Sequence, residues 1–500
     1  MTGGPAGTAT RDGGMAARIA ILGGGTAGWM AACLLAKAWP RANISVVESP
    51  EIGIVGVGEG STPQLKALFD GLGIDEATWM RAADATYKVG IAFDGWADRT
   101  PAYVHPFAGP IDRHTQPAFH ASASARRTGG DVSAHPDRFF LNSRLALALR
   151  SPIAPASFPF EPGYGYHFDA HKVGDVLRAE AIRRGVTHRA ARVTDVRVDA
   201  AGDVAALMLA HGTAQAADLF VDASGFRGMI AQEALGVAFR SFAENLFNDR
   251  AVVMPTAAGA PRPYTRATAL TAGWAWDIPL TTRTGNGYVY ASGHLSADAA
   301  ETELRTHLGL LDSDVAARHL TMKVGRVETS WTGNCLAIGL AQGFIEPLEA
   351  TALHIVQATV ERFIAAYAEG GFGPARRDAF NAAIARRYEG IRDYIVAHYR
   401  LNRRTDSDYW RDNAANDRLS DDLKAIMTAW FTGGDVGAVV AARDLADYYA
   451  PMSWEVLLAG YGTFPDAARL RAVAPPVDLR GVDDFLDRCL LNFPVLETMR

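Results

Sequence analysis

The sequence predicts an α/β (α+β) fold over residues 15–350, followed by a mainly helical region over residues 351–500. The first part rests on "ARIAILGGGTAGWMAACLLAKAW", a short apolar strand, a glycine turn and a helix, and on the strand "ISVVES" after it. The second part rests on apolar residues that recur at three- and four-residue steps, the spacing of one helix face. These residues are Leu353, Val356, Val360, Phe363, Ile364 and Tyr367, then Phe380, Ile384, Tyr388, Ile391 and Ile395.

The composition is that of an ordinary globular protein. The chain has 500 residues, 49% of them hydrophobic and 21% charged, with a formal net charge of −6. This length exceeds what one hydrophobic core usually serves, so two domains are expected. The mildly acidic balance gives no electrostatic reason to expect nucleic acid or an anionic membrane as partner, and no apolar run is long enough to span a membrane.

The three cysteines indicate a reducing compartment. Cys33, Cys335 and Cys489 are far apart, odd in number and without CxxC spacing. A disulfide framework and a zinc site are therefore not expected, and a cytoplasmic location fits.

Two segments are predicted to lack regular structure. Residues 1–14, "MTGGPAGTATRDGG", have no apolar signal-peptide region and are expected to form a flexible leader. Residues 109–136 are rich in Gly, Pro, Ser, Ala and His and are expected to form a long surface loop. The histidines in or beside this segment are irregularly spaced, so we expect no metal site. They are His105, His114, His120 and His135.

Glycines between the first strand and the first helix predict a dinucleotide site. Gly23, Gly25 and Gly28 form GxGxxG, which permits a tight turn and close approach of the backbone to a pyrophosphate. Glu48 ends the next strand, where its carboxylate can accept from ribose hydroxyls. FAD and NAD both remain open at this point, as does a glycine-rich turn that binds no ligand.

The stretch "GWAWDIPL" at residues 273–280 concentrates large side chains on one strand. Alternate strand residues face the same side, so Trp274, Trp276 and Ile278 would form one apolar wall. Taken alone, such a strand is more often part of a hydrophobic core than of a functional site.

Seven segments in colinear order resemble the flavin-dependent halogenases of the tryptophan-halogenase superfamily. The resemblance runs from about Arg18 to the helix after Thr351 and fades through the C-terminal helices, and the WxWxIP motif is its most specific part. The segments are "GGGTAGWMAA", "VGVGEGSTP", "YKVGIAFDGW", "YGYHFDAHKVGDVLR", "DLFVDASGFRG", "GWAWDIPL" and "NCLAIGLAQGFIEPLEAT".

The resemblance implies an FAD-binding fold of the flavin monooxygenase type and a specific reaction. In this family FADH2, supplied by a separate NAD(P)H-dependent flavin reductase, reacts with O2 and with chloride or bromide to give hypohalous acid. The acid then passes through the protein to a lysine beside the organic substrate. The residues that would hold FAD are Gly23, Gly25, Thr26, Ala27, Gly28, Glu48, Ser61 and Leu340. The residues that would keep the substrate away from the flavin are Trp274, Trp276, Ile278 and Pro279.

By the same resemblance, Lys88 in "YKVGIAF" is the lysine that directs the oxidant, and Glu349 in "EPLEAT" is the carboxylate facing it. Burial would lower the pKa of this lysine and favour its neutral form. The carboxylate would polarise the oxidant or accept the proton of the halogenated ring. Glu346 is the competing candidate, with an exposed loop charge as the alternative interpretation.

Halide and substrate positions follow in the same way. Thr351 and Ala352 begin the long helix, where unpaired N–H groups suit an anion, and Ala352 replaces a glycine found in many relatives. His105 and Phe107 match positions that stack the substrate ring, although a hydrogen-bonded core histidine is an equal interpretation of His105. The loosely aligned C-terminal candidates are Tyr448, Tyr449 and Trp454.

The predicted function is therefore an FADH2-dependent halogenase acting on an electron-rich, indole-like aromatic compound rather than on free tryptophan. The alternative is a flavin-dependent aromatic hydroxylase, which needs its substrate beside the flavin. A non-catalytic flavin sensor is a third class, and the joint occurrence of Lys88, Glu349 and the halide turn argues against it.

Overall fold

The computed structural model describes residues 16–51, 58–97, 102–466 and 478–496. The leader predicted for residues 1–14 lies outside these ranges. The division of the chain at residue 351 stays a prediction.

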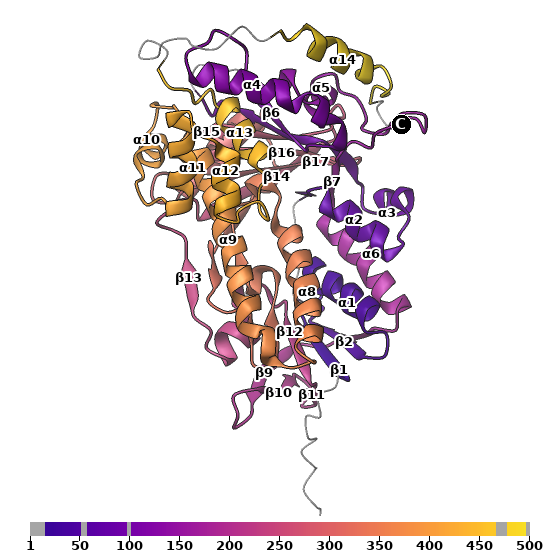
Figure 1. Ribbon diagram of the computed structural model, residues 1–500. Coiled ribbons are helices and arrows are strands. Elements are labelled where there is room, and N and C mark those ends of the chain that lie inside the picture. The colour runs from indigo at the N-terminus through magenta and orange to yellow at the C-terminus, as the bar shows by residue number, and fades with distance from the viewer. Residues whose placement is uncertain (1–15, 52–57, 98–101, 467–477, 497–500) are drawn as a thin grey trace, which may run out of the picture.

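A six-stranded, mostly parallel sheet forms the base of the molecule (Figure 1). Its central strand β1 is buried from its second residue onward, as expected of a parallel strand covered on both faces. Helix α1 (Thr26–Ala38) follows β1 and packs against α6 (Ala170–Arg183). The strands, in spatial order, are β20 (Trp331–Thr332), β21 (Cys335–Ala337), β12 (Leu219–Asp222), β1 (Arg18–Leu22), β2 (Asn43–Glu48) and β8 (Thr187–Ala190).

A seven-stranded sheet lies at the opposite end of the molecule (Figure 1). All its neighbouring pairs are antiparallel except β15 with β5. In order, its strands are β18 (Arg318–Thr321), β14 (Arg250–Ala257), β17 (Arg283–Tyr290), β16 (Gly273–Pro279), β15 (Thr265–Leu270), β5 (Gly90–Asp94) and β6 (Tyr103–Pro106).

Strand β16 carries the paired tryptophans. Trp274, Trp276 and Ile278 belong to the largest hydrophobic core, whereas Ala275 belongs to a second core with Tyr288. The three larger residues therefore share one face of the sheet, because alternate strand residues point to opposite sides. The two indole rings lie 6.1 Å apart between centroids. The alternation expected for this strand is confirmed.

Besides the two large sheets, the described residues form three-stranded sheets. The first, β3–β7–β4, carries Lys88 at the end of β4. Its strands are β3 (Glu59–Gly60), β7 (Gly165–Phe168) and β4 (Thr86–Lys88). The second is formed by β11 (Ala214–Ala216), β10 (Val204–Leu209) and β9 (Val193–Val198). The third is formed by β13 (Phe239–Ser241), β19 (Gly325–Val327) and β22 (Gly343–Phe344).

The C-terminal region is mainly helical, with α8 (Ala352–Glu369) and α9 (Arg377–Arg400) running side by side along the molecule (Figure 1). The apolar stripe predicted for the second segment is buried at all five positions, and in α8 the most buried of the predicted positions are Val356, Val360 and Phe363. The helices that follow are α10 (Asp408–Ala415), α11 (Asp421–Thr432), α12 (Val436–Ala442), α13 (Pro451–Gly460) and α14 (Arg480–Leu490). Further helices of the described residues are α2 (Gln64–Leu72), α3 (Glu76–Ala82), α4 (Gln116–Arg127), α5 (Leu141–Leu147) and α7 (Ala297–Leu308).

The long surface loop predicted for residues 109–136 is wrong. The segment contains a 3-10 turn, Pro110–His114, and the helix α4 (Gln116–Arg127). Phe119 is fully buried against the rings of Phe139 and Phe140. Small residues give α4 a weak periodicity in sequence, and tertiary packing of Phe119 compensates for it.

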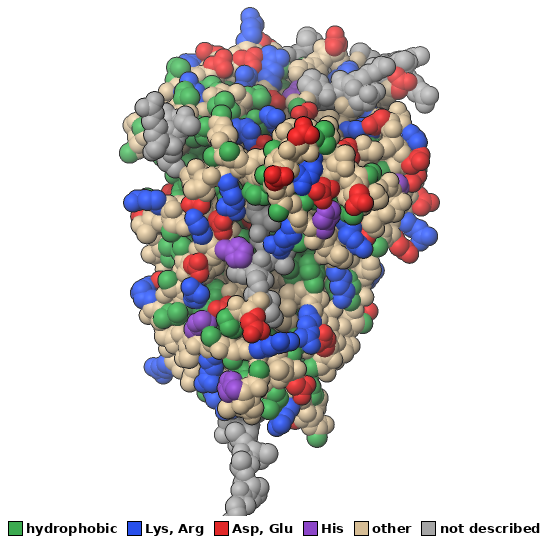
Figure 2. Space-filling view, turned by 180° about the vertical axis from the view of Figure 1, so that it is seen from behind, with side chains coloured by type: hydrophobic (Ala, Val, Ile, Leu, Met, Phe, Trp, Pro, Cys, Tyr) green, Lys and Arg blue, Asp and Glu red, His purple; other side chains and the backbone are tan. Residues whose placement is uncertain are grey.

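Over the face drawn in Figure 2, Lys and Arg side chains are interspersed with Asp and Glu. Within the described ranges, no helix is both long enough and apolar enough to cross a membrane. The three cysteines are buried and free.

Candidate active site

The glycine turn after β1 has the geometry of a nucleotide cradle. Gly23 has a φ of +113°, and a Cβ there would lie 2.3 Å from the Ala223 carbonyl oxygen. A Cβ on Gly28 would lie 2.0 Å from the carbonyl oxygen of Gly23, so α1 can pack this closely only with glycine. A Cβ on Gly25 would meet no described atom within 4 Å. Among the described residues, the space beside Gly25 is therefore open.

The helix beyond this turn has room for an anion. Gly25 is the N-cap of α1, and in this fully described helix neither a side-chain cap nor an acidic residue occupies the first turn. Thr26 is anchored by a 3.0 Å hydrogen bond from its hydroxyl to the carbonyl of Ala170. Ala27, next along the helix, would lie 3.0 Å from a Cβ on Gly339. These contacts fix α1, whose first N–H groups receive no side-chain cap.

Acidic residues end the two strands that flank β1 at this edge of the sheet. Glu48 closes β2, and its Oε1 lies 2.7 Å from Nε2 of His188 on β8. Asp222 closes β12, is fully buried, and accepts from the backbone N–H groups of Ile230 and Ala231 at 2.8 Å. Sequence reasoning quoted the motif around Asp222 but missed this role in shaping the loop.

The other two predicted cofactor residues lie on separate segments. Ser61 follows β3, is buried, and accepts from the backbone N–H of Tyr166 on β7 at 3.0 Å. Leu340 lies half-buried in the short 3-10 turn Gly339–Ala341, which meets the start of α1 through Gly339 and Ala27. Leu340 thus approaches the glycine turn.

Lys88 is 1% exposed, at the end of β4. Burial lowers the pKa of its amine to about 7, against an opposing effect from Glu349. Nζ lies 5.4 Å from the ring centroid of Phe107. A Cβ on Gly60 would lie 2.9 Å from the same nitrogen, so the amine rests against the backbone of β3. The amine is therefore held away from solvent and partly neutral near pH 7.

Glu349 is 6% exposed and lies in the 3-10 turn Pro347–Glu349, immediately before the left-handed Ala350. Its Oε1 lies 3.0 Å from Nε2 of His398 on α9, within ion-pair distance but outside hydrogen-bond geometry. Burial alone would raise the pKa of Glu349, but contact with His398 and weaker electrostatic interactions with His105 and Lys88 bring it below its usual value. The carboxylate is thus ionised although buried.

His105 begins an aromatic cluster, which we define as His105, Tyr394, Tyr449 and Trp454. Tyr394 Oη lies 3.3 Å from His105 Nε2, and its ring stacks on Tyr449 at 3.5 Å and 7°. Trp454 meets Tyr394 edge-on at 4.8 Å. Burial lowers the pKa of His105 to about 4, so its ring is neutral near pH 7.

Tyr448 lies differently from its neighbour. Its ring contacts Arg387 and Gly390, both on α9. It also lines, with Tyr449 and Trp454, a cavity of about 10 Å³, which is room for one water molecule. A ring-sized molecule would enter there only if these side chains moved.

Glu346 is not an exposed loop charge, so that alternative interpretation is wrong. It is 0% exposed and accepts from Tyr399 Oη at 2.5 Å, from Asn248 Nδ2 at 2.9 Å and from Trp274 Nε1 at 3.3 Å. Burial raises its pKa to about 7 despite these three donors. Glu346 thereby fixes the ring of Trp274.

The predicted halide positions begin α8. Thr351 is the buried N-cap without a side-chain cap bond, and Ala352, the first helical residue, is exposed. In this described turn no acidic side chain competes for the N–H groups. The position suits a small anion, because those groups carry the positive end of the helix dipole.

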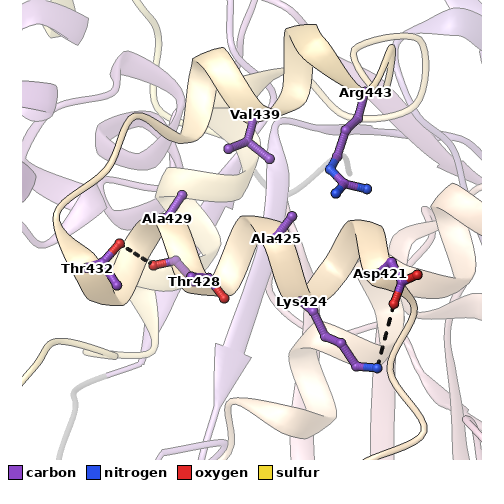
Figure 3. A pocket seen from close by; sticks show the side chains of 8 residues that line it. All are labelled: Asp421, Lys424, Ala425, Thr428, Ala429, Thr432, Val439 and Arg443. Atoms are coloured by element: carbon purple, nitrogen blue, oxygen red, sulfur yellow. Dashed lines mark hydrogen bonds and ion pairs between the residues drawn. The ribbon is translucent and has the colours of Figure 1, made fainter.

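A surface hollow lies away from these residues. It has a volume of about 600 Å³ and lies on the surface between α11 and α12, where Lys424 pairs with Asp421 (Figure 3). None of the predicted site residues lines it. The buried groups around Lys88, rather than this hollow, carry the candidate chemistry.

Comparison with known proteins identifies the family. The sequence model of the tryptophan halogenase family matches residues 18–476. The chain belongs to the tryptophan halogenase family. It is 38% identical to the 7-chloro-L-tryptophan 6-halogenase KtzR of Kutzneria sp. (strain 744) over 83% of this chain and 85% of KtzR. It is 36% identical to the tryptophan 6-halogenase SttH of Streptomyces toxytricini over 89% of each chain.

Solved structures support the same family assignment. BrvH, a flavin-dependent halogenase from Brevundimonas sp. BAL3, superposes with a TM-score of 0.83 at 32% identity, covering 97% of this chain and 98% of BrvH. The predicted fold class and the predicted class of enzyme, a flavin-dependent halogenase, are confirmed. The assignment of individual site residues stays a prediction.

Sequence reasoning missed three residues of this candidate site besides Asp222. They are Gly60 under the Lys88 amine, Asn248 beside Glu346, and His398 beside Glu349. Gly60 lies inside the quoted motif "VGVGEGSTP", which was a usable signal. Asn248 and His398 lie outside every quoted motif, and only the fold brings them to the site.

Proposed function

We propose that this chain is a two-component halogenase that uses FADH2, O2 and chloride or bromide to halogenate an electron-rich, indole-like aromatic compound. The observation that carries the proposal is the buried amine of Lys88, with its pKa at about 7, which lies near an aromatic ring and interacts electrostatically with the Glu349 carboxylate. Such an amine is unusual, because nearly all lysines keep their charge in water.

The residues at the glycine turn fit FAD. The open space before Gly25 and the uncapped first turn of α1 would receive the pyrophosphate, and Glu48 would accept from the ribose. Ser61 and Leu340 would line the rest of the site. Bound FADH2 supplies the oxygen chemistry that converts a halide to hypohalous acid. The halide would bind at the N-terminus of α8 by Thr351 and Ala352.

Lys88 would direct the oxidant. An uncharged amine can hydrogen-bond hypohalous acid or carry its halogen as a haloamine, and either form presents the halogen in one direction. The ring of Phe107, 5.4 Å from Nζ, offers a flat apolar surface on which an arene can lie. A fully charged surface lysine would do neither well.

Glu349 would complete the substitution. The ring carbon forms its bond to the halogen as the halogen–oxygen bond breaks and hydroxide leaves. The ring then loses its proton to the carboxylate of Glu349, and this proton and the hydroxide give water. The reaction therefore needs no further oxidant once hypohalous acid is present.

The tryptophans of β16 would separate the formation of hypohalous acid from the halogenation of the arene. Trp274 and Trp276 are 2% and 7% exposed, and Glu346 holds the Trp274 indole in place. A small oxidant can pass such a wall, whereas an arene cannot. With Ile278 and Pro279 the wall keeps the substrate from the cofactor, which disfavours the aromatic hydroxylase.

The aromatic cluster favours an uncharged, flat substrate. His105 is neutral near pH 7, and Tyr394 is kept uncharged by burial, which raises its pKa well above the usual value. Several relatives are named for tryptophan. We place indole-like compounds first for this chain because its recognisable ring-facing groups are neutral. Tyr448, Tyr449 and Trp454 would border the far end of this site.

A separate NAD(P)H-dependent flavin reductase would supply the reduced cofactor. The single GxGxxG serves one dinucleotide, which is FAD in this proposal. A reducing cytoplasm suits both a reduced flavin and the three free cysteines.

The test is direct halogenation. The protein is incubated with a foreign flavin reductase, FAD, NADH, bromide and a panel of indoles and phenols, and products are detected by mass spectrometry. Brominated product that disappears when bromide is omitted is expected. Oxygenated product without bromine would instead identify a hydroxylase and contradict the proposal.

A further inference from the structure

A buried histidine lies behind the catalytic carboxylate and has no role in the chemistry described above. His398 projects from the last third of α9 and is 0% exposed. Its ring packs against Phe93 of β5, with the centroids 4.6 Å apart, and against Tyr394 at 5.5 Å. A histidine buried so completely requires polar partners for both ring nitrogens.

The two nitrogens face two different groups. Nε2 lies 3.0 Å from Oε1 of Glu349, and Nδ1 lies 2.8 Å from the hydroxyl of Tyr461. When that hydroxyl donates to Nδ1, the ring hydrogen lies on Nε2 and faces the carboxylate. A small rotation of either group would turn the Nε2 contact into a hydrogen bond. Tyr461 therefore sets the tautomer that Glu349 requires.

Glu349 has few other means of staying ionised. Its pKa lies below the usual value although burial acts to raise it. His105, with a pKa of about 4, carries little charge near pH 7, and Lys88, with a pKa of about 7, is partly neutral. Burial raises the pKa of the nearby phenols, so none of them supplies a charge. They are Tyr103, Tyr394, Tyr449 and Tyr461.

The backbone alone does not fix this carboxylate. Glu349 ends a three-residue turn next to Ala350, whose φ of +54° is rare for a residue with a Cβ. A short turn leaves the glutamate side chain several rotamers. His398 comes from α9, a long and well-packed helix, and can hold one of them.

We propose that His398 is a positioning residue that holds the Glu349 carboxylate toward Lys88 through Nε2. This inference rests on the proposed function, since it assigns Glu349 the role of accepting the ring proton. His398 itself does not touch the substrate. Its loss should slow transfer of halogen to the arene without slowing formation of the oxidant.

Two substitutions of His398 distinguish the roles of its two ring nitrogens. The terminal nitrogen of glutamine in His398→Gln reaches the place of Nε2 and keeps a donor toward Glu349. The shorter amide of His398→Asn reaches only the place of Nδ1 and keeps the contact with Tyr461. Both variants are uncharged and polar, so they disturb the core to a similar extent.

Each variant is assayed for two rates. Hypohalous acid is measured with a soluble trap in the absence of arene, and halogenated arene is measured in a second reaction at saturating substrate. For His398→Asn we expect halogenated product to fall about tenfold or more, with the oxidant rate and the arene KM unchanged. For His398→Gln we expect most of the product rate to remain.

Three results would overturn this role. One is equal product rates for His398→Asn and wild type, and another is equal losses for the Asn and Gln variants. The third is a parallel loss of oxidant and product, which would indicate a purely structural histidine. A wild-type protein that makes neither oxidant nor halogenated product would instead overturn the proposed function.

Discussion

The proposed nucleotide side and the proposed substrate side of this protein are formed in different ways. The candidate nucleotide site is formed mainly by backbone: Gly23 and Gly28 permit close packing at the glycine turn, and Gly25 borders open space before the uncapped first turn of α1. The candidate site around Lys88 is formed mainly by side chains, because the ionisable Lys88 amine is buried near the Phe107 ring. A site formed by backbone groups comes from consecutive residues, whereas a site formed by side chains brings together residues that are distant in the sequence.

The two sides also differ in how they tolerate substitution. A Cβ on Gly28 would collide with the carbonyl oxygen of Gly23, a group that cannot move. A Cβ on Gly60 would meet the end of the Lys88 side chain, which can move. Damage to the nucleotide side should therefore affect the fold, and damage to the substrate side should affect the chemistry alone.

Lys88→Ala should give the largest effect and separate the two sides most clearly. Removal of the amine should lower arene halogenation by at least about 100-fold, while hypohalous acid still forms at the wild-type rate. Product is measured by chromatography and oxidant with a soluble trap. Lys424→Ala, on the surface of α11, is the control and should change neither rate. Normal regioselective halogenation by Lys88→Ala would remove this lysine from the mechanism.

The burial of Lys88 should appear in the pH dependence of stability. An unfolded chain keeps the lysine pKa near about 10.4, whereas in the folded protein it is about 7. Between these values the unfolded state binds more protons, so this lysine makes the free energy of unfolding rise with pH, by up to about 1.4 kcal/mol per unit. Below the folded pKa both states are protonated and this slope disappears.

Denaturant unfolding of wild type and Lys88→Met across this range measures the slope. The difference in free energy of unfolding between the two proteins should change with pH as described, since methionine cannot titrate. A difference that stays constant with pH would mean that the amine is solvated.

Gly60→Ala should have a smaller effect, confined to the substrate side. The new methyl group would lie 2.9 Å from the Lys88 nitrogen and displace the amine. A displaced catalytic group costs about tenfold or more in rate, so product should fall by about that factor with an unchanged thermal midpoint. Gly293→Ala, where a Cβ would meet no described atom within 4 Å, is the matched control. A large drop in stability would show instead that β3 cannot accept the methyl group.

Ala352→Val should have the smallest effect, on the cofactor side. A bulkier residue at the exposed start of α8 should hinder an anion, and such sites are worth about 0.3–1 kcal/mol. The halide concentration for half-maximal rate should rise about two- to fivefold, with the arene KM unchanged. Ala352→Gly keeps the N–H group and should not raise it. An effect on the arene KM alone would place the halide elsewhere.

The difference between the two sides also explains what the sequence could predict. The glycine turn, the strand with Trp274 and the apolar face of α9 are local patterns, and each is present in the structure. The α4 helix was missed because its packing through Phe119 involves residues 20 positions away or more. His398 was missed for the same reason, since its partner Glu349 lies on a separate turn.

The burial of the cysteines affects how long the enzyme stays active in the presence of the hypohalous acid that it forms. Hypohalous acid attacks thiolates, and burial raises the thiol pKa of Cys33 to about 12 and that of Cys335 well above normal. Burial also raises the thiol pKa of Cys489. Because its thiols are buried and protonated, the enzyme should complete many turnovers before oxidation of its cysteines inactivates it.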